Sequence, residues 1–125
     1  MPMVLSYNLS PERAARISMI CAVSGLKLRP VLPKEYAEPL GALAGLKPLT
    51  GRPALPAAFS EEMLVLCGLS EQQLDDFLMG FRRAGIPSVA LKAMLTPTNA
   101  EWDSVHLHAE LSKERDAFRA MQKKK

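Results

Sequence analysis

Two short apolar runs, sixty positions apart, dominate the hydrophobic pattern of the chain. Residues 3–7 and residues 63–67 each have the length of a strand, and the second run, Met-Leu-Val-Leu-Cys, contains no polar residue. A continuous apolar run of this kind is typical of a strand that is covered on both faces. We therefore predict a strand at each of the two positions.

Each run is followed by a helix-start signal and then by an amphipathic helix. Ser10-Pro11 supplies an N-cap followed by proline at the first helical position, and Ser70-Glu71-Gln72-Gln73 is a capping box. Apolar or small residues then recur at helical spacing, at Ala14, Ile17, Ile20, Cys21 and Ser24 in the first helix and at Leu74, Phe77, Leu78 and Phe81 in the second. We expect these stripes to face the core, and we expect Gly25 and Gly85 to end the two helices.

After each glycine the pattern changes to an alternation of apolar and polar positions, in residues 26–31 and again in residues 89–95. Alternation of this kind indicates a half-exposed strand. Pro30 confines the first of these strands to a sheet edge or to its own end, because proline has no N–H for the sheet hydrogen bonds. The apolar runs therefore fit central strands and the alternating segments fit edge strands.

The remaining parts of the chain contain helical segments and breaks. A helical segment is expected between residues 34 and 46, but Pro39 prevents it from being one uninterrupted helix. Residues 47–56 hold three prolines and one glycine, which is typical of an irregular connection. Thr98-Asn99-Ala100-Glu101 resembles a second capping box, so we expect it to open the last helix, with Trp102 docking that helix on the core.

The two halves match in the positions that matter for structure. At an offset of sixty, the identical pairs are Met3/Met63, Leu9/Leu69, Ser10/Ser70, Met19/Met79 and Gly25/Gly85. We therefore predict one α/β domain of duplicated β-α-β-α units that form a four-stranded sheet packed with helices. Its parts are a first repeat (1–46), a proline-rich connection (47–62), a second repeat (63–120) and a basic tail (121–125).

Each strand-helix-strand unit should have parallel strands and a right-handed crossover. Two arrangements of the units stay open. They either continue a parallel open sheet, or pair antiparallel about a pseudo-twofold axis in a ferredoxin-like sheet with the first strand of each unit in the centre.

Several segments of the second half carry a family resemblance. They are Leu91-Lys92-Ala93-Met94-Leu95-Thr96-Pro97-Thr98-Asn99 with Trp102, residues 63–70, and Ala84-Gly85-Ile86-Pro87. Together with residues 3–5 and 36–45, they resemble the small bacterial proteins of domain-of-unknown-function family 3783 over essentially the whole chain. Pro30 and Pro39 depart from the pattern. The resemblance implies a bacterial source and the duplicated α/β fold, and it implies no reaction because the family has none assigned.

Composition narrows the functional classes. With 125 residues, of which 48% are hydrophobic, the chain can bury one core. The net charge is +3, with seven Lys/Arg against three Asp/Glu in residues 1–60 and nine against ten in residues 61–125, which is too mild to indicate nucleic acid. No signal peptide and no membrane span are expected, so we predict a cytoplasmic protein with Cys21 and Cys67 as buried, reduced thiols.

The candidate binding residues lie where strands end, because ligands of open α/β sheets bind beyond the carboxyl ends of the strands. These residues, together with the one charged residue inside a strand, are Asn8, Lys92, Thr96, Thr98 and Asn99. If all strands are parallel, the strand ends converge beside helix N-termini that suit a carboxylate or a phosphate. If the units meet antiparallel, the strand ends lie on two opposite rims. The structural alternative is that Thr98 caps a helix, Asn8 is a turn residue and Lys92 faces solvent.

The sequence offers no chemistry that indicates a reaction. His106 and His108 point roughly 200° apart on a helix and cannot share a metal, Cys67 has no base placed beside it, and no nucleotide-binding motif is present. We expect no catalytic residue, no metal and no cofactor. The prediction is a non-catalytic interaction or regulatory module, and the alternative is a sensor that binds a small molecule or an anion at strand ends and helix N-termini. The protein partner or small ligand and the oligomeric state stay unidentified, and neither a membrane nor nucleic acid is expected as a partner.

Overall fold

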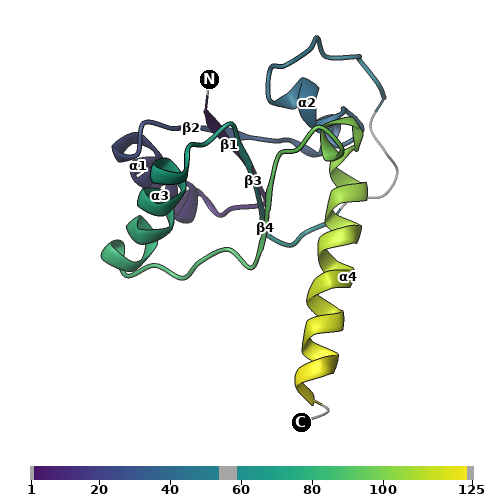
Figure 1. Ribbon diagram of the computed structural model, residues 1–125. Coiled ribbons are helices and arrows are strands. Elements are labelled where there is room, and N and C mark those ends of the chain that lie inside the picture. The colour runs from purple at the N-terminus through teal and green to yellow at the C-terminus, as the bar shows by residue number, and fades with distance from the viewer. Residues whose placement is uncertain (1, 54–58, 124–125) are drawn as a thin grey trace.

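The structure is a computed structural model that describes residues 2–53 and 59–123 (Figure 1). The first half contains β1 (Met3–Tyr7), α1 (Pro11–Val23), β2 (Lys27–Pro30), the 3-10 turn η1 (Pro33–Glu35) and α2 (Leu40–Leu43). The second half contains β3 (Met63–Cys67), α3 (Glu71–Ala84), β4 (Leu91–Met94), the 3-10 turn η2 (Asn99–Glu101) and α4 (Ser104–Lys123). The predicted α/β class is confirmed.

The four strands form one mixed sheet in the order β2-β1-β3-β4. β1 is parallel to β2, β3 is parallel to β4, and the two central strands are antiparallel to each other. This is the antiparallel arrangement of the two left open by the sequence, with the first strand of each unit central. The strands of each unit are direct neighbours rather than interleaved, and in this the sheet differs from a ferredoxin-like one.

The central register is symmetrical about one residue pair. Leu5 lies opposite Val65, while Met3 pairs with Cys67 and Tyr7 pairs with Met63. Residues sixty positions apart in the sequence are therefore related by an approximate twofold axis through the middle of the sheet. The origin of this symmetry in a duplication stays a prediction.

Both faces of the sheet are covered, as the apolar runs require. α1 and α3 pack on one face, over a core that includes Val4, Leu64, Ile17 and Phe77. α2 and α4 pack on the other face, over a core that includes Leu5, Val65, Leu40 and Leu107 (Figure 1). Pro30 ends the edge strand β2, as predicted.

The helix signals around α1 and α3 are confirmed. The Ser10 hydroxyl accepts a hydrogen bond from the Arg13 N–H, and Ser70 and Gln73 form the reciprocal bonds of a capping box. Gly85 adopts the left-handed conformation that a C-terminal cap requires, with φ of 66°. The predicted apolar stripe of α3 is only partly core, because Leu78 is 41% exposed.

The predicted start of the last helix is wrong by five residues. Thr98 makes no capping hydrogen bond; instead Thr96 and Asn99 exchange bonds, with the Asn99 N–H donating to the Thr96 hydroxyl and the Thr96 N–H donating to the Asn99 amide oxygen. α4 begins only at Ser104, where the Asp103 carboxylate accepts from the His106 N–H. Two potential caps lie five residues apart, and a short 3-10 turn separates them.

The connection between the halves is irregular in its described parts, residues 47–53 and 59–62, and residues 54–58 lie outside the described residues. Pro39 separates η1 from α2, as expected. The buried carboxylate of Glu38 holds the start of the connection, because it accepts hydrogen bonds from the N–H groups of Thr50 and Gly51 and from the Thr50 hydroxyl.

α4 extends beyond the sheet that it packs on (Figure 1). Its first part is anchored by Leu107, which is buried, and by a hydrogen bond between the Ser104 and Tyr7 hydroxyls. Past Ser112, every residue through Gln122 is exposed except the half-buried Arg115. The predicted basic tail therefore begins inside this helix, and residues 124–125 lie outside the described residues. No described helix is long and apolar enough to cross a bilayer.

Candidate functional site

The antiparallel centre of the sheet divides the strand-end residues between two rims. Asn8 follows β1, whereas Thr96, Thr98 and Asn99 follow β4, which runs in the opposite direction. Lys92 lies within β4 beside Leu64. The structure therefore brings Thr96, Thr98 and Asn99 together and keeps Asn8 apart from them.

The polar atoms of these residues bind other parts of the chain. The Asn8 amide donates to the carbonyls of Phe59 and Glu61 and its oxygen accepts from the Tyr36 hydroxyl. Asn8 has a φ of 61°, which is the left-handed conformation of a turn residue.

The side chains of Asn99 and Lys92 also form hydrogen bonds within the chain. The Asn99 amide donates to the Met94 carbonyl, and the Lys92 ammonium donates to the Val89 carbonyl at 2.7 Å. Partial burial lowers the pKa of Lys92. These hydrogen bonds give each residue a structural role, and a ligand would have to compete with them.

A cavity of about 370 Å³ lies at the carboxyl ends of β3 and β4. It collects strand-end groups of the second half together with residues near α2, and its lining consists of Pro2, Ala44, Leu46, Cys67, Gly68, Leu95, Thr96, Pro97 and Ala100. This lining contains no charged side chain. It suits an apolar group better than an anion.

Neither cysteine has the lowered pKa of a nucleophilic thiol. Cys21 and Cys67 are free and buried, and burial raises their pKa values to about 11 and about 12 respectively. Since the thiolate is the reactive form, both thiols are inert near neutral pH.

The two histidines point to different partners. His108 stacks on Phe59, with ring centroids 4.1 Å apart, and its ring nitrogen lies 3.0 Å from a Glu61 oxygen. His106 stacks on Trp102 at 4.2 Å. Within residues 2–53 and 59–123, no group of three His, Cys, Asp or Glu side chains could hold a metal ion.

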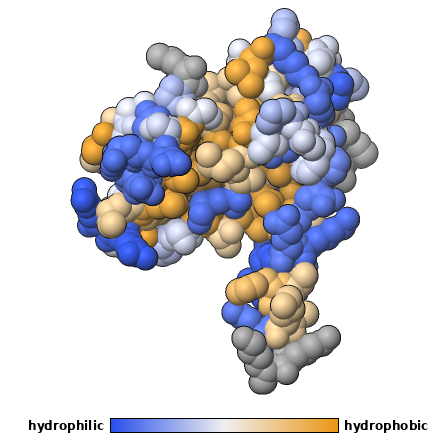
Figure 2. All heavy atoms as spheres, viewed as in Figure 1, coloured by the Kyte–Doolittle hydropathy of each residue, from blue (hydrophilic) through white to orange (hydrophobic). Residues whose placement is uncertain are grey.

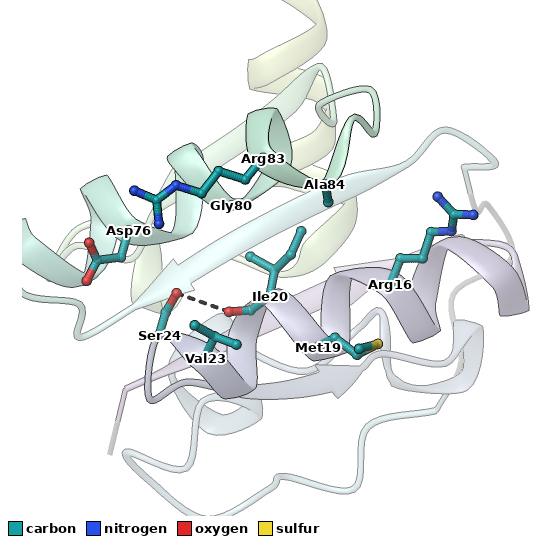
Figure 3. A pocket seen from close by; sticks show the side chains of 9 residues that line it. All are labelled: Arg16, Met19, Ile20, Val23, Ser24, Asp76, Gly80, Arg83 and Ala84. Carbon is teal, nitrogen blue, oxygen red and sulfur yellow. Dashed lines mark hydrogen bonds between the residues drawn. The ribbon is translucent and has the colours of Figure 1, made fainter.

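A second cavity, about 570 Å³, is a groove between α1 and α3 on the outer face of that helix layer (Figure 3). Its lining is Arg16, Met19, Ile20, Val23, Ser24, Asp76, Gly80, Arg83 and Ala84. Four pairs in this lining are sixty positions apart, namely Arg16/Asp76, Ile20/Gly80, Val23/Arg83 and Ser24/Ala84. The groove therefore lies on the approximate twofold axis.

Gly80 sets the depth of this α1–α3 groove. A Cβ atom at Gly80 would lie 2.6 Å from Cγ2 of Ile20, closer than real Cβ contacts allow. Figure 3 shows Ile20 pointing from α1 toward α3, with Gly80 opposite it. The missing side chain lets the two helices approach each other, and Ile20 forms an apolar floor.

The walls of the groove are apolar and its rim is charged. Met19 is 71% exposed and Val23 is 90% exposed, both on α1. Arg16 and Arg83 carry positive charge on the two helices, and Asp76 carries negative charge on α3. Arg16 lies only loosely against Glu12, with 3.7 Å between the Arg16 guanidinium nitrogen and the Glu12 carboxylate oxygen.

The groove holds no pair of groups for acid–base or nucleophilic catalysis. Its one hydroxyl, on Ser24, donates to the Ile20 carbonyl at 3.0 Å (Figure 3). The rest of the lining is apolar surface with charged side chains beside it.

The groove was not predicted from the sequence, because the apolar stripes of the two helices indicate only their core-facing sides. The sequence did contain a signal, namely apolar residues outside the core-facing stripe. Met19 and Val23 lie on α1 outside the stripe that includes the buried Ile17 and Cys21. Large apolar residues on an outward face are a recognised sign of an interaction surface when they occur together.

Comparisons with known proteins give a family and no further relatives. The family described as "Domain of unknown function (DUF3783)" matches residues 62–118, which include β3, α3, β4 and most of α4. No curated protein and no solved structure matches the chain. The family match covers only the second half of the chain. The resemblance inferred from the sequence had extended over essentially the whole chain. Over residues 62–118, the chain is therefore similar to this family of unknown function.

Proposed function

We propose that the protein is a non-catalytic interaction module that binds an amphipathic helix of a partner in the α1–α3 groove. The observation that carries the proposal is the exposure of Met19 and Val23 at the edge of a groove of about 570 Å³. Apolar grooves lined by two helices are a recurring site for the apolar face of a third helix.

The charges on the rim define the kind of helix that fits. Arg16 favours an acidic residue at its end of the groove, and Asp76, which lies toward the opposite end with the Arg83 side chain extending toward it (Figure 3), favours a basic residue there. The partner is therefore a helix with two bulky apolar residues one turn apart, flanked by charges of both signs.

The test uses a synthetic helical peptide with Phe and Met three residues apart, flanked by Glu and Arg, added to isotope-labelled protein. Amide chemical shifts should change along α1 and α3, around Arg16, Val23 and Gly80. Val23→Lys should weaken binding at least tenfold, because it removes an apolar contact worth more than about 1.4 kcal/mol. Lysine is well tolerated in the last turn of a helix, so the variant should fold.

Two controls make the result specific. Leu49→Lys changes an exposed apolar residue outside the groove and should leave peptide binding unchanged. A peptide with Ser in place of Phe and Met should not bind. Shift changes confined to the α2 and α4 side, or equal binding by Val23→Lys, would reject the proposal.

Sensing of a small molecule is a second candidate, supported by the cavity at the ends of β3 and β4, whose lining includes Thr96. The remaining candidate residues Asn8, Lys92, Thr98 and Asn99 are not in that lining. A thermal-shift series with small apolar compounds and with inorganic phosphate, in the protein and in Thr96→Val, tests it. Stabilisation by a compound that Thr96→Val abolishes supports sensing, and no stabilisation by either class counts against it.

A further inference from the structure

We infer that the cavity at the carboxyl ends of β3 and β4, the β3–β4 cavity, binds a small, neutral aromatic molecule. The inference rests on the second candidate function, small-molecule sensing, and it names the class of ligand. It is independent of the α1–α3 groove. The approximate twofold axis relates the β3–β4 cavity to a position on the opposite rim, at the carboxyl ends of β1 and β2, and the chain fills that position with an aromatic ring.

The two rims start from the same backbone geometry. The axis relates Tyr7, at the end of β1, to Cys67, at the end of β3. Each is followed by a residue in the left-handed conformation, Asn8 with φ of 61° and Gly68 with φ of 70°. Asn8 and Gly68 are therefore equivalent as well.

The relation continues past the edge strands. Two residues after each edge strand, a backbone N–H donates to the side chain three residues later, from Leu32 to Glu35 after β2 and from Thr96 to Asn99 after β4. Leu32 and Thr96 therefore occupy equivalent places on the two rims.

The helices that follow, α2 and α4, are related in the same way at their starts. The N–H of Leu40, the first residue of α2, donates to a carbonyl just before α4, and the N–H of Ser104, the first residue of α4, donates to a carbonyl just before α2. Ala44 and His108 each lie four residues after these starts. They are therefore equivalent residues of the two rims.

On the rim of β1 and β2, the place between these residues is filled by Phe59. Its ring stacks on His108 and on Tyr36, with ring centroids 4.1 Å and 4.8 Å apart, and its centroid lies 5.6 Å from that of Tyr7. The Asn8 amide donates to the Phe59 carbonyl at 2.9 Å. This rim therefore holds an aromatic ring that the surrounding residues fix in place.

On the rim of β3 and β4, the equivalent residues are smaller. Where the first rim has Tyr7, Asn8, Leu32 and His108, the lining of the β3–β4 cavity has Cys67, Gly68, Thr96 and Ala44 respectively. Among the described residues, this lining includes no aromatic side chain. The cavity therefore lies where the other rim is packed with aromatic rings.

The size and the lining of the β3–β4 cavity restrict the ligand. An apolar cavity of about 150 Å³ is enough for benzene, so a cavity of about 370 Å³ has room for a substituted ring or for two fused rings. The described lining has no charged side chain, and an ion would lose its hydration there without gaining a partner. The ligand is therefore uncharged.

The mouth of the cavity offers one polar and one apolar contact. The Thr96 hydroxyl accepts from the Asn99 N–H at 3.1 Å, and a hydroxyl that accepts one hydrogen bond keeps its proton to donate. Leu46 also belongs to the lining and is 71% exposed. Figure 2 shows hydrophobic atoms next to hydrophilic ones over the end of the molecule that holds α2. A ring with an oxygen substituent would cover Leu46 and accept a hydrogen bond from Thr96.

The test is a titration of the isotope-labelled full chain with three compounds of one skeleton, followed by amide chemical shifts. Benzyl alcohol should bind with a Kd of about 1 mM or lower. It should change the shifts of Gly68, Thr96 and Ala100. Benzoate, which is charged, and cyclohexylmethanol, whose saturated ring is thicker, should each bind at least about tenfold more weakly.

Two pairs of variants place the ligand in the cavity. Ala44→Leu fills the cavity and should weaken binding of benzyl alcohol at least about tenfold, whereas Ala22→Leu adds the same atoms on the exposed face of α1 and should leave it unchanged. Thr96 is exposed, so its variants should fold even if Ala44→Leu does not. Thr96→Val should weaken binding at least about threefold, and Thr96→Ser, which keeps the hydroxyl, should weaken it less.

The outcomes separate this inference from the functions proposed above. Absence of shift changes with benzyl alcohol at about 10 mM, shift changes confined to α1 and α3, or unchanged binding in both Ala44→Leu and Thr96→Val would overturn it. Equal or tighter binding of benzoate or cyclohexylmethanol would overturn the neutral aromatic class and leave sensing of another small molecule in place. Sensing itself would fail only if the thermal-shift series also finds no stabilising compound, and the peptide test of the α1–α3 groove does not depend on any of these results.

Discussion

The two helix layers of this sheet are built in different ways. α1 and α3 have 13 and 14 residues, both are capped by a serine, and they meet across an approximate twofold axis at Ile20 and Gly80. On the other face, α2 has four residues and α4 has 20. The sheet and the crossover helices keep the symmetry, whereas the segments after each second strand do not. Two exposed apolar surfaces follow from this difference: the α1–α3 groove with Met19 and Val23 on the symmetrical side, and Phe118 and Met121 on the projecting end of α4 on the asymmetrical side.

The sharpest test of the asymmetrical layer compares two positions on α4. Leu107→Ala should lower the free energy of unfolding by about 2–5 kcal/mol, because a fully buried leucine leaves a cavity in the core. Phe118→Ala should change it by no more than about 0.5 kcal/mol at concentrations where the chain is monomeric. Urea unfolding followed by circular dichroism measures both. A large loss for Phe118→Ala in the monomer would mean that the projecting part packs on its own chain.

On the symmetrical side, the closest contact between α1 and α3 is the next largest effect. Gly80→Ala places a Cβ atom 2.6 Å from Cγ2 of Ile20, and overpacking of this kind costs about 1–3 kcal/mol. Alanine recovers about 1 kcal/mol of that through its better helix propensity. We therefore expect a net loss in stability of up to about 2 kcal/mol.

A double-mutant cycle identifies the cause of that loss. Ile20→Ala removes the clashing methyl group, so the double variant Ile20→Ala/Gly80→Ala should be more stable than the sum of the two single changes by at least about 0.5 kcal/mol. Ala15→Gly on the exposed face of α1 calibrates the propensity difference in the same protein. Strict additivity would show that the two helices separate without cost, and the groove would then not be fixed by Gly80.

The difference between the layers also decides how much the sequence could predict. The strands at residues 3–7 and 63–67, the caps at Ser10 and Ser70 and the stop at Gly85 are set by local pattern and were predicted within a residue or two. The start of α4 was not, because Thr96, Thr98 and Asp103 are all residues that can cap, and only tertiary packing selects among them.

The local hydrophobic pattern could not predict the relative direction of the two units. It therefore could not predict which of the candidate residues lie together. A buried strand has the same apolar pattern whether its neighbour is parallel or antiparallel. The antiparallel pairing of β1 with β3 places Asn8 on a different rim from Asn99. The groove depends on a contact between residues sixty positions apart, Ile20 and Gly80. A glycine within a predicted helix indicates a close contact with another helix only when the residue opposite the glycine is known.

The smallest expected effect concerns acid stability, and it also distinguishes the layers. Of the described carboxylates, those with a lowered pKa are Glu35, Glu38 and Glu61, and all three lie on or beside the α2 and α4 side. For Glu38, hydrogen bonds from the Thr50 N–H and hydroxyl hold the pKa below its usual value of 4.5. A carboxyl group with a lowered folded pKa stabilises the fold above its unfolded pKa, and that contribution is lost as the pH falls through the folded pKa.

Acid should therefore loosen the asymmetrical layer first. Between about pH 6 and about pH 3, the stability of Glu38→Gln should fall less steeply than that of the wild type, since glutamine cannot take up a proton. Hydrogen exchange near the lower end of this range should show earlier loss of protection in residues 36–51 than in α1 and α3. Equal loss in both layers would mean that the connection held by Glu38 is not where acid unfolding begins.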